Sequence, residues 1–363
     1  TPGTYHVTTS AAYYGAIPNS PWLDKGLLVE GAATNMLTYS EQLDNAAWTK
    51  TNATAGANAA VSPDGKTTMD SFTGDAGTAG KSLRTAVTIV NGTDYVYSFF
   101  VKKQSSFIQV YSNSGWAGNS KVNIDLLTGV VSADFSFTAS AEDFGTFWRV
   151  SVEGPATATS SNIYISLITD ITAARGASTA VVGPIYLWGM QFELGTFPNS
   201  YIPTVASAVA RSADKISIAT SSITGFSFLE STYVVEWENQ EDTNFSRVVI
   251  AVADGTTSTT RVELARGGTA YVNTDGSTKA QEVGVNAVGK TAIGFGGGSM
   301  SQSTNGSAVA TDASVTVFSS GDLTLLSIGV RNDLAYHYLN GSIARITYYP
   351  TRLSDITLQA LSA

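Results

Sequence analysis

Short segments with a two-residue alternation of apolar and polar side chains recur along the first two hundred residues. Examples are "YVYSFFVKK" (95–103), "SFIQVYS" (106–112), "FWRVSVEG" (147–154) and "NIYISLIT" (162–169). This period, together with the many β-branched and aromatic residues, predicts β-strands. Turn signals such as "SPDG" (62–65) separate the segments, and no long period of 3.6 residues is evident. The pattern predicts an antiparallel β-sandwich.

A second series of strands begins after a weakly patterned stretch of small residues, "VASAVARSAD" (205–214). It opens with "KISIATSS" and "STYVVEWEN", so we place a domain boundary near 205–213. Near its end, Asn340-Gly341 lies between the apolar runs of 335–350 and predicts a β-hairpin. Ser354 is expected to cap a short amphipathic C-terminal helix.

The prediction is therefore an all-β protein with two antiparallel β-sandwich domains, 26–208 and 209–363. Residues 1–25, which include the two prolines of "AIPNSPW", are predicted to form an extended N-terminal arm.

The stretch "YLWGMQFELGTFPNSYIPT" (186–204) places a Trp, a Gln and a Glu close together, as a sugar-binding site would. Strict alternation, however, sends five large apolar residues to one face, which predicts a core face with Trp188 in it. Gln191 and Glu193 are then candidate polar residues on the opposite face. The apolar set is Tyr186, Trp188, Met190, Phe192 and Leu194.

Composition limits the classes of molecule that could bind this protein. Charged residues make up 13% of the chain, the net charge is −9, and no basic cluster exceeds Lys102-Lys103, which disfavours nucleic acid and anionic membranes. The absence of cysteine excludes disulfide scaffolds and thiol catalysis. No stretch approaches 18 apolar residues, so no membrane insertion is predicted. A neutral partner such as a glycan fits better.

One segment, "GVNAVGKT" (284–291), matches the phosphate-binding loop pattern in full. That mechanism needs a helix N-terminus directly after the loop. The sequence continues with "AIGFGGGSMSQSTNG", which contains too many glycines for a helix. We interpret the match as fortuitous.

An acidic run, "EWENQE" (236–241), spaces Glu236, Glu238 and Glu241 like the catalytic strand of laminarinase-type glycoside hydrolases. The central acid is Glu rather than Asp, and Asn239-Gln240 indicates the end of a strand. We favour a solvated strand end and keep a glycoside hydrolase as the alternative.

The only two histidines are His6 in the arm and His337 on a strand, so we predict no metal site built on two or three His of one chain. His337 between two tyrosines is typical of a sheet residue. No EF-hand-like calcium loop is present, although calcium bound by other oxygen ligands stays open. We predict no cofactor, no metal site and no catalytic residue.

Exposed tryptophans could stack sugar rings. Trp48, Trp148 and Trp188 are predicted to lie in the core, and Trp237 is undecided. Trp116 in "SNSGWAGNS" has only small polar neighbours, so an exposed loop position is expected. The predicted ligand rim is loop 111–121, with Trp116, Tyr111, Asn113 and Asn119.

The residues also carry a family resemblance. "GLLVEGAATNMLTYSEQLDNAAWTK" (26–50), "VSPDGKTTMDSF", "YVYSFFVKK", "VNIDLLTGVVS", "WRVSV" and the 186–204 stretch resemble a module of tailed-phage virion proteins, namely head fibres, tail fibres and tail spikes. "LNGSIARITYYPTRLSDITLQALSA" (339–363) is similar to the end of the domain that often follows it. The resemblance implies a jelly roll like that of carbohydrate-binding modules, then a concanavalin A or laminin G-like domain. "GAATN" departs from the charged residue that usually follows the Glu.

The resemblance implies a non-enzymatic protein on the extracellular surface of a phage particle, which binds host surface glycans for adsorption. Expected partners are the host glycan, other virion proteins and further copies of the chain in a homotrimer. Two alternatives stay open: a polysaccharide depolymerase that uses Glu236, Glu238 or Glu241, and purely structural decoration of the capsid.

Overall fold

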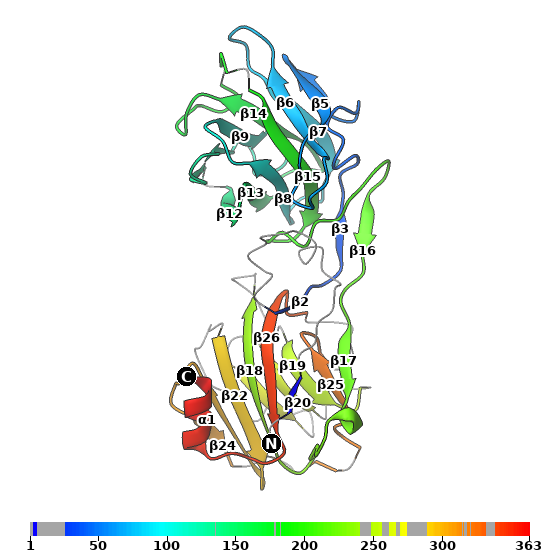
Figure 1. Cartoon of the computed structure of the whole chain (residues 1–363), viewed down its shortest axis with the longest axis vertical. Helices are drawn as coiled ribbons and strands as arrows, with labels where there is room; N and C mark the ends of the chain where they lie inside the picture. Colours follow the sequence, from blue (N-terminus) through cyan, green and yellow to red (C-terminus); the bar gives the residue numbers. More distant parts are fainter. Residues whose placement is uncertain are drawn as a thin grey trace. The chain divides into compact units, whose positions relative to one another are not determined.

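The structure is a computed structural model that describes residues 3–5, 26–134, 136–177, 179–181, 183–239, 248–255, 261–265, 269–273, 289–313, 315, 318–319, 321–331 and 338–363. The chain divides into two compact units, drawn in Figure 1. Of the described residues, those within 32–212 form the N-terminal unit. Those within 3–5, 26–31 and 213–363 form the C-terminal unit.

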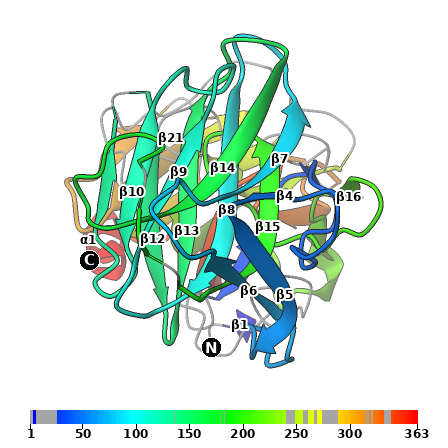
Figure 2. The ribbon, with the colours of Figure 1, turned by 90° about the horizontal axis from the view of Figure 1, so that it is seen from above.

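The N-terminal unit contains two six-stranded antiparallel sheets, whose strands can be followed in Figure 2. Sheet I runs in the order β11 (Val131–Ala133), β10 (Lys121–Asp125), β9 (Phe107–Ser112), β14 (Ser160–Ile168), β7 (Ser82–Thr88) and β4 (Thr49–Thr51). Sheet II runs in the order β12 (Thr138–Phe144), β13 (Phe147–Pro155), β8 (Asp94–Lys102), β15 (Ile185–Leu194), β6 (Met69–Gly74) and β5 (Ala53–Ala60). A small separate sheet pairs β3 (Ala33–Asn35) with β16 (Val209–Arg211).

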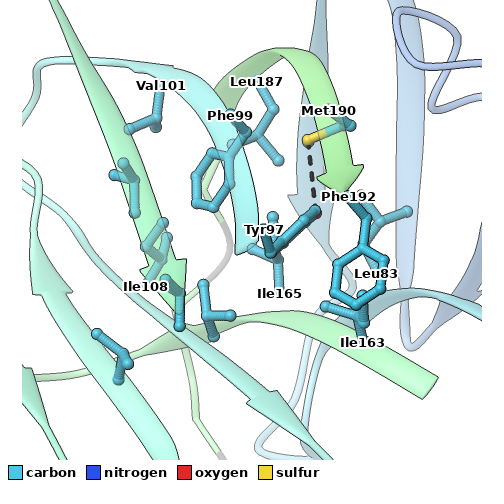
Figure 3. Close-up of a cluster of buried hydrophobic side chains, with 14 of the residues drawn as sticks. Leu83, Tyr97, Phe99, Val101, Ile108, Ile163, Ile165, Leu187, Met190 and Phe192 are labelled. Carbon is cyan, nitrogen blue, oxygen red and sulfur yellow. Dashed lines mark hydrogen bonds between the residues drawn. The ribbon is translucent and has the colours of Figure 1, made fainter. Parts of the chain in front are cut away.

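One face of each sheet supplies the core of the N-terminal unit. Alternate residues of β9 and β14, such as Ile108 and Ile165, meet Tyr97 and Phe99 of β8. Figure 3 shows this cluster, in which the Tyr97 hydroxyl donates a hydrogen bond to Met190 Sδ at 3.5 Å. The predicted β-sandwich is confirmed, because each sheet buries one face against the other.

A bulge in β15 changes which face its residues occupy. The register against β8 shifts between Trp188 and Gln191, where Gly189 adopts a φ of +67°. Leu187 and Met190 consequently both point into the core between the sheets, whereas strict alternation would separate them. The predicted single face of five apolar residues is therefore wrong. Trp188 is buried, as predicted, but it packs on the outer side of sheet II against Phe100 and Tyr201.

The C-terminal unit is a second sandwich. Sheet III consists of β1 (Gly3–Tyr5), β26 (Gly341–Tyr349), β18 (Ser231–Asn239), β22 (Gly289–Gly296), β23 (Ser299–Thr304) and β24 (Ala310–Asp312), with β2 (Leu27–Val29) also paired to β26. Sheet IV consists of β17 (Ile216–Ala219), β25 (Leu325–Ile328), β19 (Val248–Ala253), β20 (Arg261–Ala265) and β21 (Thr269–Asn273). Residues of both sheets share one core, including Tyr233, Ile293, Ile250 and Leu326. A short 3₁₀ helix, Thr220–Ser222, follows β17.

The predicted C-terminal helix is confirmed as α1 (Asp355–Ser362). The Ser354 hydroxyl accepts a hydrogen bond from the Thr357 N–H at 3.3 Å, which is an N-cap. Leu358 of α1 packs with Val234 and Ala292, so the helix covers part of the outer face of sheet III.

Two boundary features differ from the sequence prediction. Residues 3–5 of the predicted arm form a strand that pairs with β26, and residues 26–31 belong to the C-terminal unit rather than to the first domain. The hairpin predicted at Asn340-Gly341 needs residues 335–337, which lie outside the described residues; β26 pairs with β1, β2 and β18. Asn340 does turn the chain, with a φ of +49°, and its side chain accepts from the Gly31 N–H.

The bulge predicts a specific cost for Gly189→Ala. A Cβ at this position would have an unfavourable positive φ and would lie 3.3 Å from Phe100. We expect urea denaturation to show a loss of about 1–2 kcal/mol from the backbone alone, with the contact adding to it. Gly65→Ala is the matched control, since Gly65 has a φ of +83° and no atom within 4 Å of the added Cβ. An equal or smaller loss in Gly189→Ala would contradict the role assigned to the bulge.

Candidate functional site

The outer face of sheet I carries a row of side chains that crosses five strands. Strand register aligns Lys121 of β10, Tyr111 of β9, Tyr164 of β14, Arg84 of β7 and Thr49 of β4. Figure 2 shows β10, β9, β14 and β7 side by side. Since neighbouring strands lie about 4.8 Å apart, these five residues form a continuous strip, which we call the outer row. Its side chains face outward because the flanking residues of the same strands point into the core.

Two stacked tyrosines form the centre of the outer row. The rings of Tyr111 and Tyr164 are 4.6 Å apart between centroids and within 6° of parallel. The Arg175 guanidinium carbon lies 5.0 Å from the centre of the Tyr111 ring. Tyr111 is thus held between a ring and a cation. Within the described part of the chain, no other ring or guanidinium stacks on Tyr164.

Hydrogen bonds fix both arginines beside the tyrosines. Arg84 Nη1 donates to Asn162 Oδ1 at 2.9 Å. Arg175 Nη2 donates to the carbonyl oxygen of Ser112. Both side chains are half-buried, so they retain contact with solvent while their positions are restrained.

The loop that carries Arg175 is attached to the same face of sheet I. Gln109 and Asn123 are buried cross-strand neighbours, and Gln109 Nε2 donates to Asn123 Oδ1 at 2.7 Å. Asn123 Nδ2 then donates to the carbonyls of Ile171 and Ala173, each at 2.9 Å, and the Gly176 N–H donates to Gln109 Oε1 at 2.7 Å. This buried amide pair therefore positions the loop before any ligand binds.

A polar cleft of about 380 Å³ adjoins the outer row. Asn162 connects the two, because its side chain accepts from Arg84 and its N–H donates to Asn113 Oδ1 at 3.3 Å. Hydroxyls and amides dominate the cleft, and such groups suit a ligand rich in hydroxyls. Its lining residues are Ala86, Val87, Thr88, Asn113, Ser114, Ser160, Ser161 and Asn162.

The predicted exposure of Trp116 is wrong. Its side chain is 0% exposed and packs edge-on against Tyr97, Phe137 and Phe192. Its Nε1 donates to the carbonyl of Gly154 at 2.9 Å. The polar residues next to Trp116 in the sequence led to a wrong prediction of its exposure, because its apolar partners come from distant strands. Trp116 therefore cannot serve as a sugar platform.

The other predicted rim residues have different positions. Tyr111 lies in the outer row and Asn113 lines the cleft, so the structure brings these two near each other through Asn162. Asn119 is exposed but does not line the cleft.

Sequence reasoning missed Arg84, Asn162, Tyr164 and Arg175. Tyr164 could have been found, because it alternates with Ile163 and Ile165 and must face outward if they are core. No local pattern marks Arg175, which depends on a buried amide pair distant in sequence.

The other tryptophans that the structure describes are also buried. Trp48 and Trp148 belong to the core of the N-terminal unit, as predicted, and Trp237 belongs to that of the C-terminal unit.

The acidic run is part of an ion-pair cluster on the outer face of sheet III. Glu236 Oε1 lies 2.6 Å from Arg345 Nη2 and 3.8 Å from Lys290 Nζ, its cross-strand neighbours. Glu236 and Glu238 border a depression of about 470 Å³, and Glu241 lies outside the described residues. β18 ends at Asn239, as predicted. Glu236 is thus engaged in ion pairs with residues of both neighbouring strands.

The phosphate-loop match has no helix behind it. Gly289, Lys290 and Thr291 begin β22, which continues as a strand to Gly296, so the described part of the motif is β-structure. Residues 284–288, His6 and His337 lie outside the described residues. Among the described residues, no three His, Asp or Glu side chains are grouped as a metal site would require. No helix among them has the length and apolar character to cross a membrane.

Gln191 and Glu193 form a buried structural network. Glu193 Oε1 accepts from Gln191 Nε2 at 2.7 Å and from the Asn199 N–H at 2.9 Å, while Oε2 accepts from Asn199 Nδ2 at 2.9 Å. Burial raises the pKa of Glu193 to about 7, although these hydrogen bonds and Arg149 oppose the shift. The network ties the chain around Asn199 to sheet II, so these residues are not a ligand surface.

Compared with known proteins, the chain matches no family model, and a search of curated proteins finds no relative. The outer row and its cleft are therefore assessed from their own chemistry.

Burial of Trp116 predicts a large effect of Trp116→Ala on stability. We expect a loss of about 3–5 kcal/mol in the free energy of unfolding, measured by urea denaturation. The matched control is Asn119→Ala in the same loop, for which we expect a change within about 0.5 kcal/mol. Similar values for the two variants would show that Trp116 is not packed as described.

The raised pKa of Glu193 predicts that the stability of the protein depends on pH. Because its pKa is raised from 4.5 to about 7 in the folded state, its contribution to stability is fully present below about pH 4.5 and is lost as the pH rises through about 7. As the pH rises over this interval, the parent should therefore lose on the order of 3 kcal/mol of unfolding free energy relative to Glu193→Gln, which has no titrating group at this position. A difference that instead grows in favour of the parent toward neutral pH would contradict the assignment.

Proposed function

We propose that this chain is a non-enzymatic glycan-binding protein of a phage particle's surface, and that the outer row with its cleft contacts the glycan. One observation carries the proposal: a rigid tyrosine pair on the outer face of a sheet, flanked by arginines and amides. Apolar faces of sugar rings pack on aromatic rings, while amides and charged groups bind the hydroxyls.

Tyr164 is the platform in this proposal. One side of its ring is occupied by Tyr111, and the other side is where a sugar ring can stack. Arg84 and Asn162, which are hydrogen-bonded to each other, border Tyr164 and offer donors and an acceptor to hydroxyls. The adjoining cleft accommodates a further residue of the same saccharide.

The virion location rests on the resemblance of the sequence segments to fibre and spike modules. The homotrimer and the contacts with other virion proteins belong to the same proposal. Against pure decoration of the capsid, the tyrosine pair favours a ligand. Against a depolymerase, Glu236 is engaged by Arg345 and Lys290.

A glycan array of bacterial surface polysaccharides tests the proposal with the full chain in its native oligomer. We expect binding to a restricted set of glycans and, for Tyr164→Ala, roughly tenfold weaker binding to that set because the platform is removed. Tyr186→Ala is the matched control, since Tyr186 is a half-buried tyrosine that lies between core residues Ile185 and Leu187 and therefore faces the outer side of sheet II.

Two results would count against the proposal. If the parent protein binds no glycan, the decoration role is favoured. If Tyr164→Ala and Tyr186→Ala weaken binding equally, the glycan does not use the outer row. Release of shortened saccharides from a bound polysaccharide would instead favour the depolymerase.

A further inference from the structure

We infer that the ligand of the outer row is an acidic saccharide chain that carries carboxylate groups. This inference rests on the proposed function and names its ligand class. The observation behind it is local charge: two guanidinium groups flank the tyrosine pair, although the chain as a whole has a net charge of −9. A positive surface in an acidic chain favours an anionic ligand.

Neither arginine has an acidic partner in the described part of the chain. Arg84 and Arg175 form no ion pair there, and each makes one side-chain hydrogen bond, to Asn162 and to Ser112 respectively. Each guanidinium carries five N–H donors, and although Arg175 Nε is buried, the Nη groups of both arginines keep donors for a ligand. An anion would satisfy them with charge-assisted hydrogen bonds.

Nearby carboxylates do not cancel this charge. Asp134 is paired with Lys121, whose Nζ lies 3.2 Å from Asp134 Oδ1. Asp170 accepts hydrogen bonds from the N–H and the hydroxyl of Thr172 in its own turn, and these bonds lower its pKa. Arg175, by contrast, acts electrostatically on Tyr111, where it opposes the increase in the Tyr111 pKa that burial causes.

Spacing indicates a chain rather than a single sugar. Arg84 is on β7, and Tyr111, beneath Arg175, is on β9. These strands are separated by β14, and Arg175 lies on the side of the Tyr111 ring away from Tyr164, so the two cations are roughly 15 Å apart across the sheet. One carboxylate cannot contact both guanidinium groups at that spacing. Two acidic groups on different residues of one saccharide can, with a sugar ring on Tyr164 between them.

The position of the anion favours carboxylates over phosphates. A guanidinium presents a planar fork that matches either anion with two parallel hydrogen bonds, so the fork alone does not separate them. A carboxylate bonded directly to a sugar ring stays close to a ring that stacks on Tyr164, and Arg84 borders Tyr164. A phosphodiester between two sugars lies outside the ring. Both anions contain oxygen acceptors, so the experiment separates them.

The test measures the affinity of the full chain for three probes by calorimetry. They are oligogalacturonate, the same oligosaccharide with its carboxyl groups reduced to neutral alcohols, and a phosphodiester-linked sugar polymer. We expect oligogalacturonate to bind at least tenfold more tightly than the other two, and its affinity to fall as salt is raised.

Charge variants then locate the contact. Arg84→Gln and Arg175→Gln should each weaken oligogalacturonate binding by about tenfold or more. Arg345→Gln is the matched control, because it removes the same charge from the outer face of sheet III and should leave binding unchanged. Arg84→Lys keeps the charge without the planar fork, and we expect intermediate affinity. It also serves as the test if a Gln variant fails to fold.

The outcomes separate this inference from the proposed function. Equal affinity for the acidic and the reduced oligosaccharide, or unchanged affinity in both Gln variants, overturns the acidic ligand but leaves glycan binding in place. Tighter binding of the phosphodiester polymer overturns the assignment to carboxylates. A parent protein that binds none of the three probes and no glycan on the array overturns the proposed function itself.

Discussion

Face-to-face burial of two antiparallel sheets is the constraint on which the rest of the N-terminal unit depends. Because side chains alternate along a strand, burying Ile163 and Ile165 requires Tyr164 to face outward. Antiparallel register then places Tyr111 and Arg84 beside it on the neighbouring strands. The outer row is therefore a consequence of the core, and a one-residue shift in register would turn the same side chains inward.

The fold class, the two sandwiches and the C-terminal helix cap could be predicted because they rest on local signals. Alternation, turn residues and a capping Ser are all visible within a few residues of sequence. The bulge at Gly189 was not visible, since a glycine within an alternating run looks like any other small residue. Its effect is large, because it places both Leu187 and Met190 in the core and moves Trp188 to the side opposite the one that simple alternation assigns to the core.

The site was harder to predict than the fold. Trp116 has polar neighbours in sequence but aromatic partners on distant strands, so local composition gave the wrong exposure. Tyr111 and Asn113 were predicted to lie near a ligand, but for a different reason. The prediction relied on an exposed Trp116 in the same loop, whereas the structure places Tyr111 in the outer row of sheet I. Arg175 reaches Tyr111 only because Gln109 and Asn123 hold its loop by hydrogen bonds. Long-range pairing of this kind leaves no local pattern.

The central claim is that a glycan binds across the outer row, and a crystal structure of the full chain with a bound acidic oligosaccharide tests it most directly. The account predicts a sugar ring stacked on Tyr164, with acidic groups at Arg84 and Arg175 and a further residue toward the cleft at Asn113. Saccharide density in the depression beside Glu236 and Glu238, with the outer row empty, would contradict it.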